Sequence, residues 1–248
     1  MILNQNNKIF VAGQRLLVRE WNPSNVDGLK IWLDGSEKFV VLNNSVVECW
    51  YDRSGNLNDF RQTTGILRPS YNQGTFSSLY FENNVLSSVN TININTFTMF
   101  VVYKSTTPTG YIYNYGNDST TESGFFMSTG NNSIGTTVSG LTSATIKKYG
   151  SNWGVDNSWR ICCQTYDGTH LNHQLYINNN SVTMSTYLGY GNNPGILNCN
   201  KSLNVGGLYS GTSGLKGNIA EIMCYNKVLS LEEINSINGY LNSKFSIY

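Results

Sequence analysis

Hydrophobic and polar positions alternate in short segments from residue 28 onward, and clusters of turn-forming residues separate these segments. About a dozen of the segments have the length and the β-branched and aromatic content that is typical of strands. The segment FTMFVVYK is apolar on both of its faces, which predicts a central strand covered on two sides. No alternation of strands with helices and no internal repeat is visible. The pattern therefore predicts an all-β sandwich or jelly roll.

One segment near the end of the chain, SLEEINSINGYLNSKF, has a helical period instead. Ser230 followed three residues later by Glu233 has the spacing of a capping box, which predicts a helix start. Apolar side chains then recur every three or four residues and form one stripe: Ile234, Ile237, Leu241 and Phe245. We expect a helix over residues 230–245 that packs on the edge or the convex side of the sandwich.

The composition narrows the classes of partner. Charged residues make up 12% of the chain and the formal net charge is +1, which argues against a nucleic acid or a charged membrane surface as partner. No stretch approaches the length of apolar sequence that a membrane helix needs, so we expect no membrane insertion. The first residues lack the pattern of a signal peptide, and we expect synthesis in a cytoplasm without export by the usual signal.

The chain has five cysteines, an odd number, with no C-x-x-C spacing, which argues against a zinc site. Cys162 and Cys163 are adjacent within an apolar run. We expect buried free thiols. One disulfide, for example involving Cys199, is the alternative.

The segment DRSGNLND, residues 52–59, places oxygen-bearing side chains two residues apart, as the start of a calcium loop does. Leu57 and Thr63 stand where a helix–loop–helix calcium site needs glycine and glutamate. The preceding VVECWY is typical of a strand rather than a helix. A turn after a strand is therefore the better interpretation, and a calcium site of another geometry stays open.

Residues 1–25 differ from the rest and are interpreted as an N-terminal arm, with residues 26–248 as one domain. The arm contains KIFVAGQRLLVREW, which favours one or two short strands around Gly13, and the linker-like WNPSNVDG follows it. Such an arm is expected to bind the domain or another subunit by strand addition. Its alternating apolar side chains are Ile9, Val11, Leu16 and Val18.

Several segments together resemble a known family. The order GLKIWLDGS, VVECWYDRSGNLNDFRQ, RPSY, LYFENNVL and the closing GLKGNIAEIMCYNKVLSLEEINSINGYLNSKF is similar to concanavalin A-like, laminin-G-type jelly-roll domains. The resemblance spans roughly residues 26 to 246. It implies a jelly-roll sandwich of two antiparallel sheets with one C-terminal helix, a structural role for Glu221, and a structural role for the DRSGN turn.

The family occurs in secreted bacterial proteins and in phage or viral structural proteins, so the resemblance leaves the function open. Its members serve in carbohydrate binding, protein adhesion or structural display, and fold does not imply function. Some relatives hold calcium near their binding loops. No such ligand can be matched to a residue of this sequence, so we expect no cofactor and leave Ca²⁺ open.

The sequence offers no clear catalytic constellation. Hydrolysis of a glycosidic bond needs two facing carboxylates, and the acidic residues of the chain are scattered: Glu82, Asp118, Glu122, Asp156, Asp167 and Glu221. Both histidines, His170 and His173, lie in DGTHLNH, and a surface turn residue is the better account of His170. We therefore expect a protein that is not an enzyme, with a glycoside-active enzyme as the weak alternative.

Sugar binding is the more plausible activity, since loop aromatics flanked by Asn, Asp or Gly suit recognition of sugar rings. The candidate glycan-binding residues are Tyr115, Asn117, Asp118, Trp153, Tyr190 and Tyr209. The alternative for each aromatic is core or rim packing, which aromatics supply more often than ligand contacts.

Two hypotheses remain from different classes. The first is a virion structural protein, a capsid or tail decoration or a fibre component on the virion exterior, in which the arm binds other virion proteins or sister subunits. We then expect a homo-oligomer whose outer loops contact cell-surface glycans. The second is a stand-alone carbohydrate-binding or adhesive module of a secreted bacterial protein.

Overall fold

A computed structural model of the 248-residue chain provides the structure. It describes residues 3–4, 8–11, 14–16, 21–108, 110–116, 124–130, 133–139, 145–151, 156–169, 171–188, 195–197, 200–208 and 213–248. All structural statements below concern these residues.

The first of two packed layers is built around strand β12 (Phe97–Ser105), which is antiparallel to β17 (Arg160–Tyr166) on one side and to β23 (Lys216–Tyr225) on the other. This confirms the central strand predicted from FTMFVVYK. The layer is completed at its two sides by β4 (Leu29–Asp34), β9 (Ser78–Glu82), β18 (Gln174–Ile177) and β19 (Asn180–Ser181).

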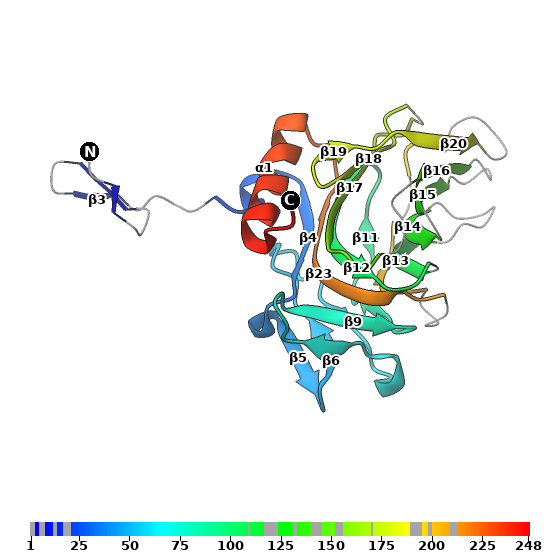
Figure 1. Ribbon diagram of the computed structural model, residues 1–248, viewed down its shortest axis with the longest axis horizontal. Coiled ribbons are helices and arrows are strands. Elements are labelled where there is room, and N and C mark those ends of the chain that lie inside the picture. The colour runs from blue at the N-terminus through cyan, green and yellow to red at the C-terminus, as the bar shows by residue number, and fades with distance from the viewer. Residues whose placement is uncertain are drawn as a thin grey trace.

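The second layer is a series of antiparallel neighbours on the other side of the core (Figure 1). In spatial order its strands are β7 (Phe60–Arg61), β10 (Leu86–Ser88), β22 (Leu203–Val205), β13 (Gly110–Gly116), β14 (Gly124–Gly130), β15 (Ser133–Ser139), β16 (Thr145–Ser151) and β20 (Met184–Leu188).

Strands β5 (Val40–Asn43), β6 (Val46–Trp50) and β8 (Ser70–Asn72) join the two layers, so that one hydrogen-bonded sheet runs through both. A separate pair is formed by β11 (Ile92–Asn93) and β21 (Asn200–Lys201). Three 3-10 helices are short: η1 (Pro23–Asn25), η2 (Glu37–Phe39) and η3 (Gly65–Leu67).

In the N-terminal arm, β1 (Leu3–Asn4), β2 (Lys8–Val11) and β3 (Gln14–Leu16) form a three-stranded antiparallel sheet of their own. Ile9 pairs with Leu3 on one side and with Leu16 on the other. The predicted short strands are therefore confirmed, whereas their assembly role and the division of the chain at residue 25 stay predictions.

The helix α1 (Leu231–Phe245) covers the face of the first layer that points away from the second layer (Figure 1). The predicted capping box is confirmed, because Ser230 accepts from the Glu233 amide and Glu233 accepts from the Ser230 amide. The predicted apolar stripe is buried against Trp32, Phe100, Ile161 and Met223, among others. Among the described residues, no helix is long and apolar enough to cross a membrane.

The main core lies between the two layers and contains large aromatics of both, including Phe97 and Phe125, which are stacked at a ring-centroid distance of 3.9 Å. Cys49, Cys162, Cys163 and Cys224 are buried and free, which confirms the expectation for these four thiols. Cys199 lies outside the described residues. The all-β jelly roll with one C-terminal helix is thus confirmed.

Candidate functional site

The DRSGN segment is a turn built around one carboxylate. Asp52 Oδ1 accepts from the Trp32 and Ser54 amides, and its Oδ2 accepts from the Asn58 amide and the Ser54 hydroxyl. This confirms the turn interpretation. Both oxygens of Asp52 are used to hold the turn against β4, which positions the neighbouring Arg53 side chain.

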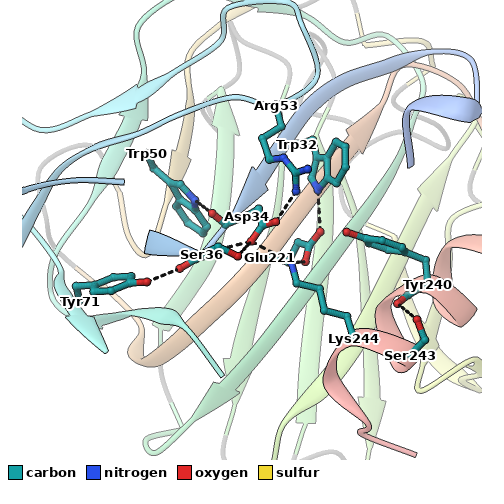
Figure 2. A network of polar contacts seen from close by, with 11 residues as sticks. Trp32, Asp34, Ser36, Trp50, Arg53, Tyr71, Glu221, Tyr240, Ser243 and Lys244 are labelled. Carbon is teal, nitrogen blue, oxygen red and sulfur yellow. Dashed lines mark hydrogen bonds and ion pairs between the residues drawn. The ribbon is translucent and has the colours of Figure 1, made fainter. Parts of the chain in front are cut away.

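Arg53 belongs to a network of charged side chains that joins the first layer to α1 (Figure 2). Glu221 on β23 accepts from the Trp32 indole at 2.7 Å and from Lys244 Nζ at 2.7 Å. Lys244 on α1 also contacts Asp34 Oδ1 at 2.9 Å, and Asp34 is paired with Arg53 through its other oxygen. The Arg53 guanidinium lies 3.8 Å from the centroid of the Trp32 ring.

The two carboxylates of this network differ in acidity, as catalytic carboxylate pairs do. Burial raises the pKa of Glu221 to about 7, although Lys244 acts to lower it. Burial alone would also raise the pKa of Asp34, but Lys244 and hydrogen bonds from Ser36 outweigh this effect and hold the pKa below its usual value.

Catalysis by this pair is nevertheless excluded by its packing. Asp34 and Glu221 are 4% and 1% exposed, and the Lys244 ammonium lies between them, where a sugar would have to bind. The network instead ties α1 to β4 and β23, which agrees with the structural role implied for Glu221.

A second polar group lies inside the main core. Tyr113 donates to Gln164 Oε1, the Gln164 amide lies 2.9 Å from His173 Nε2, and Lys148 Nζ donates to the His173 carbonyl. Burial, together with Lys148, lowers the pKa of His173 to about 3, so the ring is neutral. These side chains are buried and have no surface for a large ligand. His170 lies outside the described residues.

The best candidate for a binding surface is the face of the second layer that points away from the main core, here called the outer face. Alternation along the strands assigns its side chains. On β15, Ile134 and Val138 point into the core, so Gly135, Thr137 and Ser139 lie on the outer face. On β15 the outer face therefore carries small and hydroxyl-bearing residues, of which Thr137 and Ser139 are buried.

An exposed tyrosine leans over a glycine on this face. Tyr149 on β16 pairs with Gly135 on β15, which pairs with Ser128 on β14. A Cβ atom at Gly135 would lie 3.3 Å from the Tyr149 ring and 3.3 Å from Ser128 Oγ, so the ring and the hydroxyl converge over the glycine. Tyr149 is 45% exposed, and Ser185 on the next strand is also exposed.

The adjacent row of the outer face is rich in amide and hydroxyl groups. Ser87 on β10, Asn204 on β22 and Asn114 on β13 are successive cross-strand neighbours, and Ser87 donates to Asn204 Oδ1 at 2.6 Å. Further along the row, Thr137 on β15 pairs with the half-buried Lys147 on β16. Asn114, Asn204 and Thr137 are buried, however. The polar groups open to a ligand near the exposed Tyr149 ring are therefore those of Ser128, Lys147 and Ser185, which suit hydrogen bonding to sugar hydroxyls.

Only one of the predicted glycan-binding residues, Tyr115, lies among the described residues, and the prediction for it was wrong. Tyr115 lies within β13, is fully buried, and donates its hydroxyl to the Ile92 carbonyl. A ring without an exposed face cannot stack on a sugar, so Tyr115 is a core residue. The other candidates lie outside the described residues and stay predictions: Asn117, Asp118, Trp153, Tyr190 and Tyr209. Val18 of the arm lies outside them as well.

Sequence reasoning missed Tyr149, Gly135 and Ser128. The segments that contain them are rich in Ser, Thr and Gly, and they could be interpreted as weak strands or as loops. A glycine and an aromatic residue in neighbouring strands were the only available signal, and their pairing depends on a register that sequence does not reveal.

Comparisons with known proteins agree with this architecture. Residues 73–235 match the family described as the concanavalin A-like lectin/glucanases superfamily. No curated protein matches the chain. Among solved structures, the chain is similar to the binding domain of botulinum neurotoxin serotype D/C VPI 5993, with a TM-score of 0.61 and 14% identity over 89% of this chain and 53% of that chain.

Two further similar structures are binding domains as well. That of Paraclostridial Mosquitocidal Protein 1 has a TM-score of 0.59 and 14% identity over 89% of this chain and 54% of that chain. The botulinum neurotoxin serotype D ligand binding domain in complex with N-acetylneuraminic acid has a TM-score of 0.56 and 15% identity over 86% of this chain and 51% of that chain. This chain spans about half the length of these structures.

Proposed function

Since the chain belongs to the concanavalin A-like lectin/glucanases superfamily, we propose that it is a non-enzymatic domain that binds carbohydrate through its outer face. The observation that carries this proposal is the exposed Tyr149 ring that leans over Gly135 next to the Ser128 hydroxyl. An aromatic face can pack on the C–H groups of a sugar while neighbouring hydroxyl and amide groups bond to its hydroxyls.

Binding without hydrolysis is supported by the state of the acidic residues. Asp34 and Glu221 are closed off by Lys244 and lie on the first layer, whereas the proposed sugar surface lies on the second. Glu82 is paired with Lys216 and Asp156 with Arg160. These four carboxylates are therefore engaged in ion pairs away from the outer face.

Sialylated sugars belong among the candidate ligands. One similar structure is a complex with N-acetylneuraminic acid, and Lys147 supplies a cation next to the proposed site. The likeness covers only about half of that chain, so it does not say which half holds the sugar. The choice between neutral and anionic glycans is therefore a matter for experiment.

A glycan array that contains neutral and sialylated oligosaccharides tests the proposal, with and without calcium. We expect hits for the wild type and about tenfold weaker binding for Tyr149→Ala, a change of about 1.4 kcal/mol and the scale of one aromatic contact. The matched control is Tyr51→Ala, because Tyr51 is 40% exposed and lies outside the outer face. An array without hits, or equal binding by the Tyr149 and Tyr51 variants, would contradict the proposal.

We propose a virion structural role on the virion exterior as a second candidate, with a secreted bacterial module as its alternative. The separate sheet β1–β2–β3 supports it. Among the described residues, β1 and β3 each pair with β2 alone, so each keeps one edge for strand addition to a sister subunit or another virion protein. Deleting residues 1–22 should abolish particle incorporation and leave a folded domain. Normal incorporation of the truncated chain would contradict this role.

A further inference from the structure

A pocket of about 210 Å³ lies where the hairpin β17–β18 meets the start of α1 (Figure 1). Its polar wall is the hairpin. Thr165 pairs with Gln174, and alternation along the chain places Asp167, Asn172 and Tyr176 on the same side. The opposite wall is aliphatic and comes from the first turn of α1 and the loop before it: Val228, Leu229, Leu231 and Ile234. The pocket belongs to the first layer, whereas the proposed sugar surface belongs to the second.

Hydrogen bonds within the polar wall engage its donors and leave acceptors for a ligand. The Asn172 amide nitrogen donates to Asp167 Oδ2, and the Gln174 amide nitrogen donates to the Leu171 carbonyl. The Thr165 hydroxyl donates to the Asn172 carbonyl. No described residue donates to Asn172 Oδ1 or to Gln174 Oε1. Two amide oxygens therefore remain as acceptors beside a carboxylate.

Asp167 has room for one more hydrogen bond. Its Oδ1 accepts from the amide and the hydroxyl of Thr169, and its Oδ2 accepts from Asn172. A carboxylate has about four accepting positions, so about one stays open, on Oδ2. The planar fork of an arginine needs two such positions side by side, whereas each N–H of an ammonium group needs only one. Asp167 therefore suits the ammonium group of a lysine better than a guanidinium.

The charges on the segments that line the pocket favour a cation. Burial acts to raise the pKa of Asp167, but hydrogen bonds from Asn172 and Thr169 outweigh burial and hold the pKa below its usual value. On the α1 side, Lys227 is paired with Glu233 at 2.9 Å, and the exposed Glu232 adds a second carboxylate to the first turn. These two carboxylates offset the positive end of the helix dipole.

The size and the aliphatic wall of the pocket suit one lysine side chain. Pockets that enclose a whole small molecule measure roughly 300–1,000 Å³, so this one is small for such a ligand. Lysine packs its methylene stem along apolar surface while its ammonium group stays hydrogen-bonded. Leu231 and Val228 are 61% and 37% exposed, so a methylene stem can cover them.

From these observations we propose that the pocket binds a lysine side chain presented by a partner protein. The methylene stem packs on Leu231 and its aliphatic neighbours, and the ammonium group donates to Asp167, Asn172 and Gln174. A free aliphatic amine has the same chemistry, and the experiment separates the two sources. The inference adds a protein-binding site to the proposed sugar-binding function and does not depend on it.

Nuclear magnetic resonance titration of the isotope-labelled full chain with short end-blocked peptides tests the inference. A glycine peptide with one central lysine should cause saturable shifts of the backbone amides of residues 165–169, 171–176 and 228–234 at millimolar concentration. Peptides with norleucine or arginine in place of the lysine should bind about tenfold more weakly, the scale of one hydrogen bond to a charged group. Butylammonium should bind no more tightly than the lysine peptide.

Two variants with matched controls locate the binding. Asp167→Asn should weaken binding of the lysine peptide about tenfold, whereas Asp27→Asn removes the same charge from an exposed position outside the pocket and should not. Because Asp167 also holds its own turn, Leu231→Lys provides a second variant at an exposed position. Its ammonium group should compete with the peptide and abolish the shifts. Ile66→Lys adds the same charge outside the pocket, at a residue that is 87% exposed, and should keep them.

Several results would overturn the inference. Equal binding of the norleucine peptide would show that the ammonium group is not recognised, and tighter binding of butylammonium would exclude a partner protein as the source. Absence of saturable shifts at millimolar concentration, or unchanged binding in both Asp167→Asn and Leu231→Lys, would also overturn it. None of these results bears on sugar binding, which the glycan array tests separately.

Discussion

Replacing Glu221 by glutamine should change how the stability of the domain depends on pH. Glu221 is fully buried, and its pKa is raised from 4.5 to about 7, chiefly by burial. Below pH 4.5 the carboxyl group is protonated in both the folded and the unfolded state. Between pH 4.5 and 7 the unfolded state loses the proton first, so the contribution of Glu221 to stability falls as pH rises.

The size of this loss follows from the shift. A difference of about 2.5 pKa units corresponds to about 3 kcal/mol, at 1.36 kcal/mol per unit. Glutamine has a similar shape and does not titrate, so Glu221→Gln lacks this loss. The free energy of unfolding of the variant, relative to wild type, should therefore increase by about 3 kcal/mol between pH 4.5 and pH 8.

The difference between the two proteins is more informative than the wild-type profile alone. The pKa of His173 is lowered from 6.5 to about 3, so its contribution to stability rises with pH between these values and opposes that of Glu221. The contribution of His173 is the same in both proteins and cancels in the difference. Urea unfolding followed by circular dichroism at several pH values measures both free energies.

Glu82, at the surface, provides a control in which the dependence of stability on pH has the opposite sign. Lys216 lowers the pKa of Glu82, so Glu82→Gln should not gain stability relative to wild type as the pH rises. If the difference for Glu221→Gln is flat with pH, or decreases, then Lys244 rather than burial decides the acidity of Glu221, and the reasoning is refuted.

Three other predictions concern the sugar site, α1 and the thiols. Gly135→Ala should displace the Tyr149 ring and weaken binding to any glycan identified on the array, measured by calorimetry, while the far-ultraviolet dichroism stays unchanged. Leu241→Ala should lower the free energy of unfolding by about 2–5 kcal/mol in urea titrations, because a buried side chain at the α1 interface is lost. Burial raises the pKa of Cys162 and Cys224 to about 12, so a thiol reagent at pH 8 should modify them only after unfolding; rapid reaction in the native state would contradict this.

The elements that could be predicted from the sequence are those whose signal is local. The start of α1 follows from Ser230 and Glu233, and β12 follows from an uninterrupted apolar run. Tyr115 shows where local reasoning fails. Its polar neighbours Asn117 and Asp118 indicate a loop, but β13 extends to residue 116 and turns the Tyr115 ring into the core.

The outer face could not be predicted for a related reason. Whether Tyr149 meets Gly135 depends on the register of two strands, and a shift of one residue would turn Tyr149 to the core. The buried network could not be predicted either, because its members Trp32 and Glu221 are 189 residues apart in the chain. Local patterns carry no information about such distant pairings.

That separation also constrains how the chain folds during its synthesis. Strand β4 is made well before its hydrogen-bonded partner β23, because the two strands are far apart in the chain. The apolar strand β12 likewise lacks one neighbour until β23 has left the ribosome. Contacts between distant segments slow folding and expose unpaired strands meanwhile. Nascent chains that stop before residue 216 lack β23 and should therefore aggregate or bind chaperones. Slower translation should not prevent this, because it does not supply the missing strand.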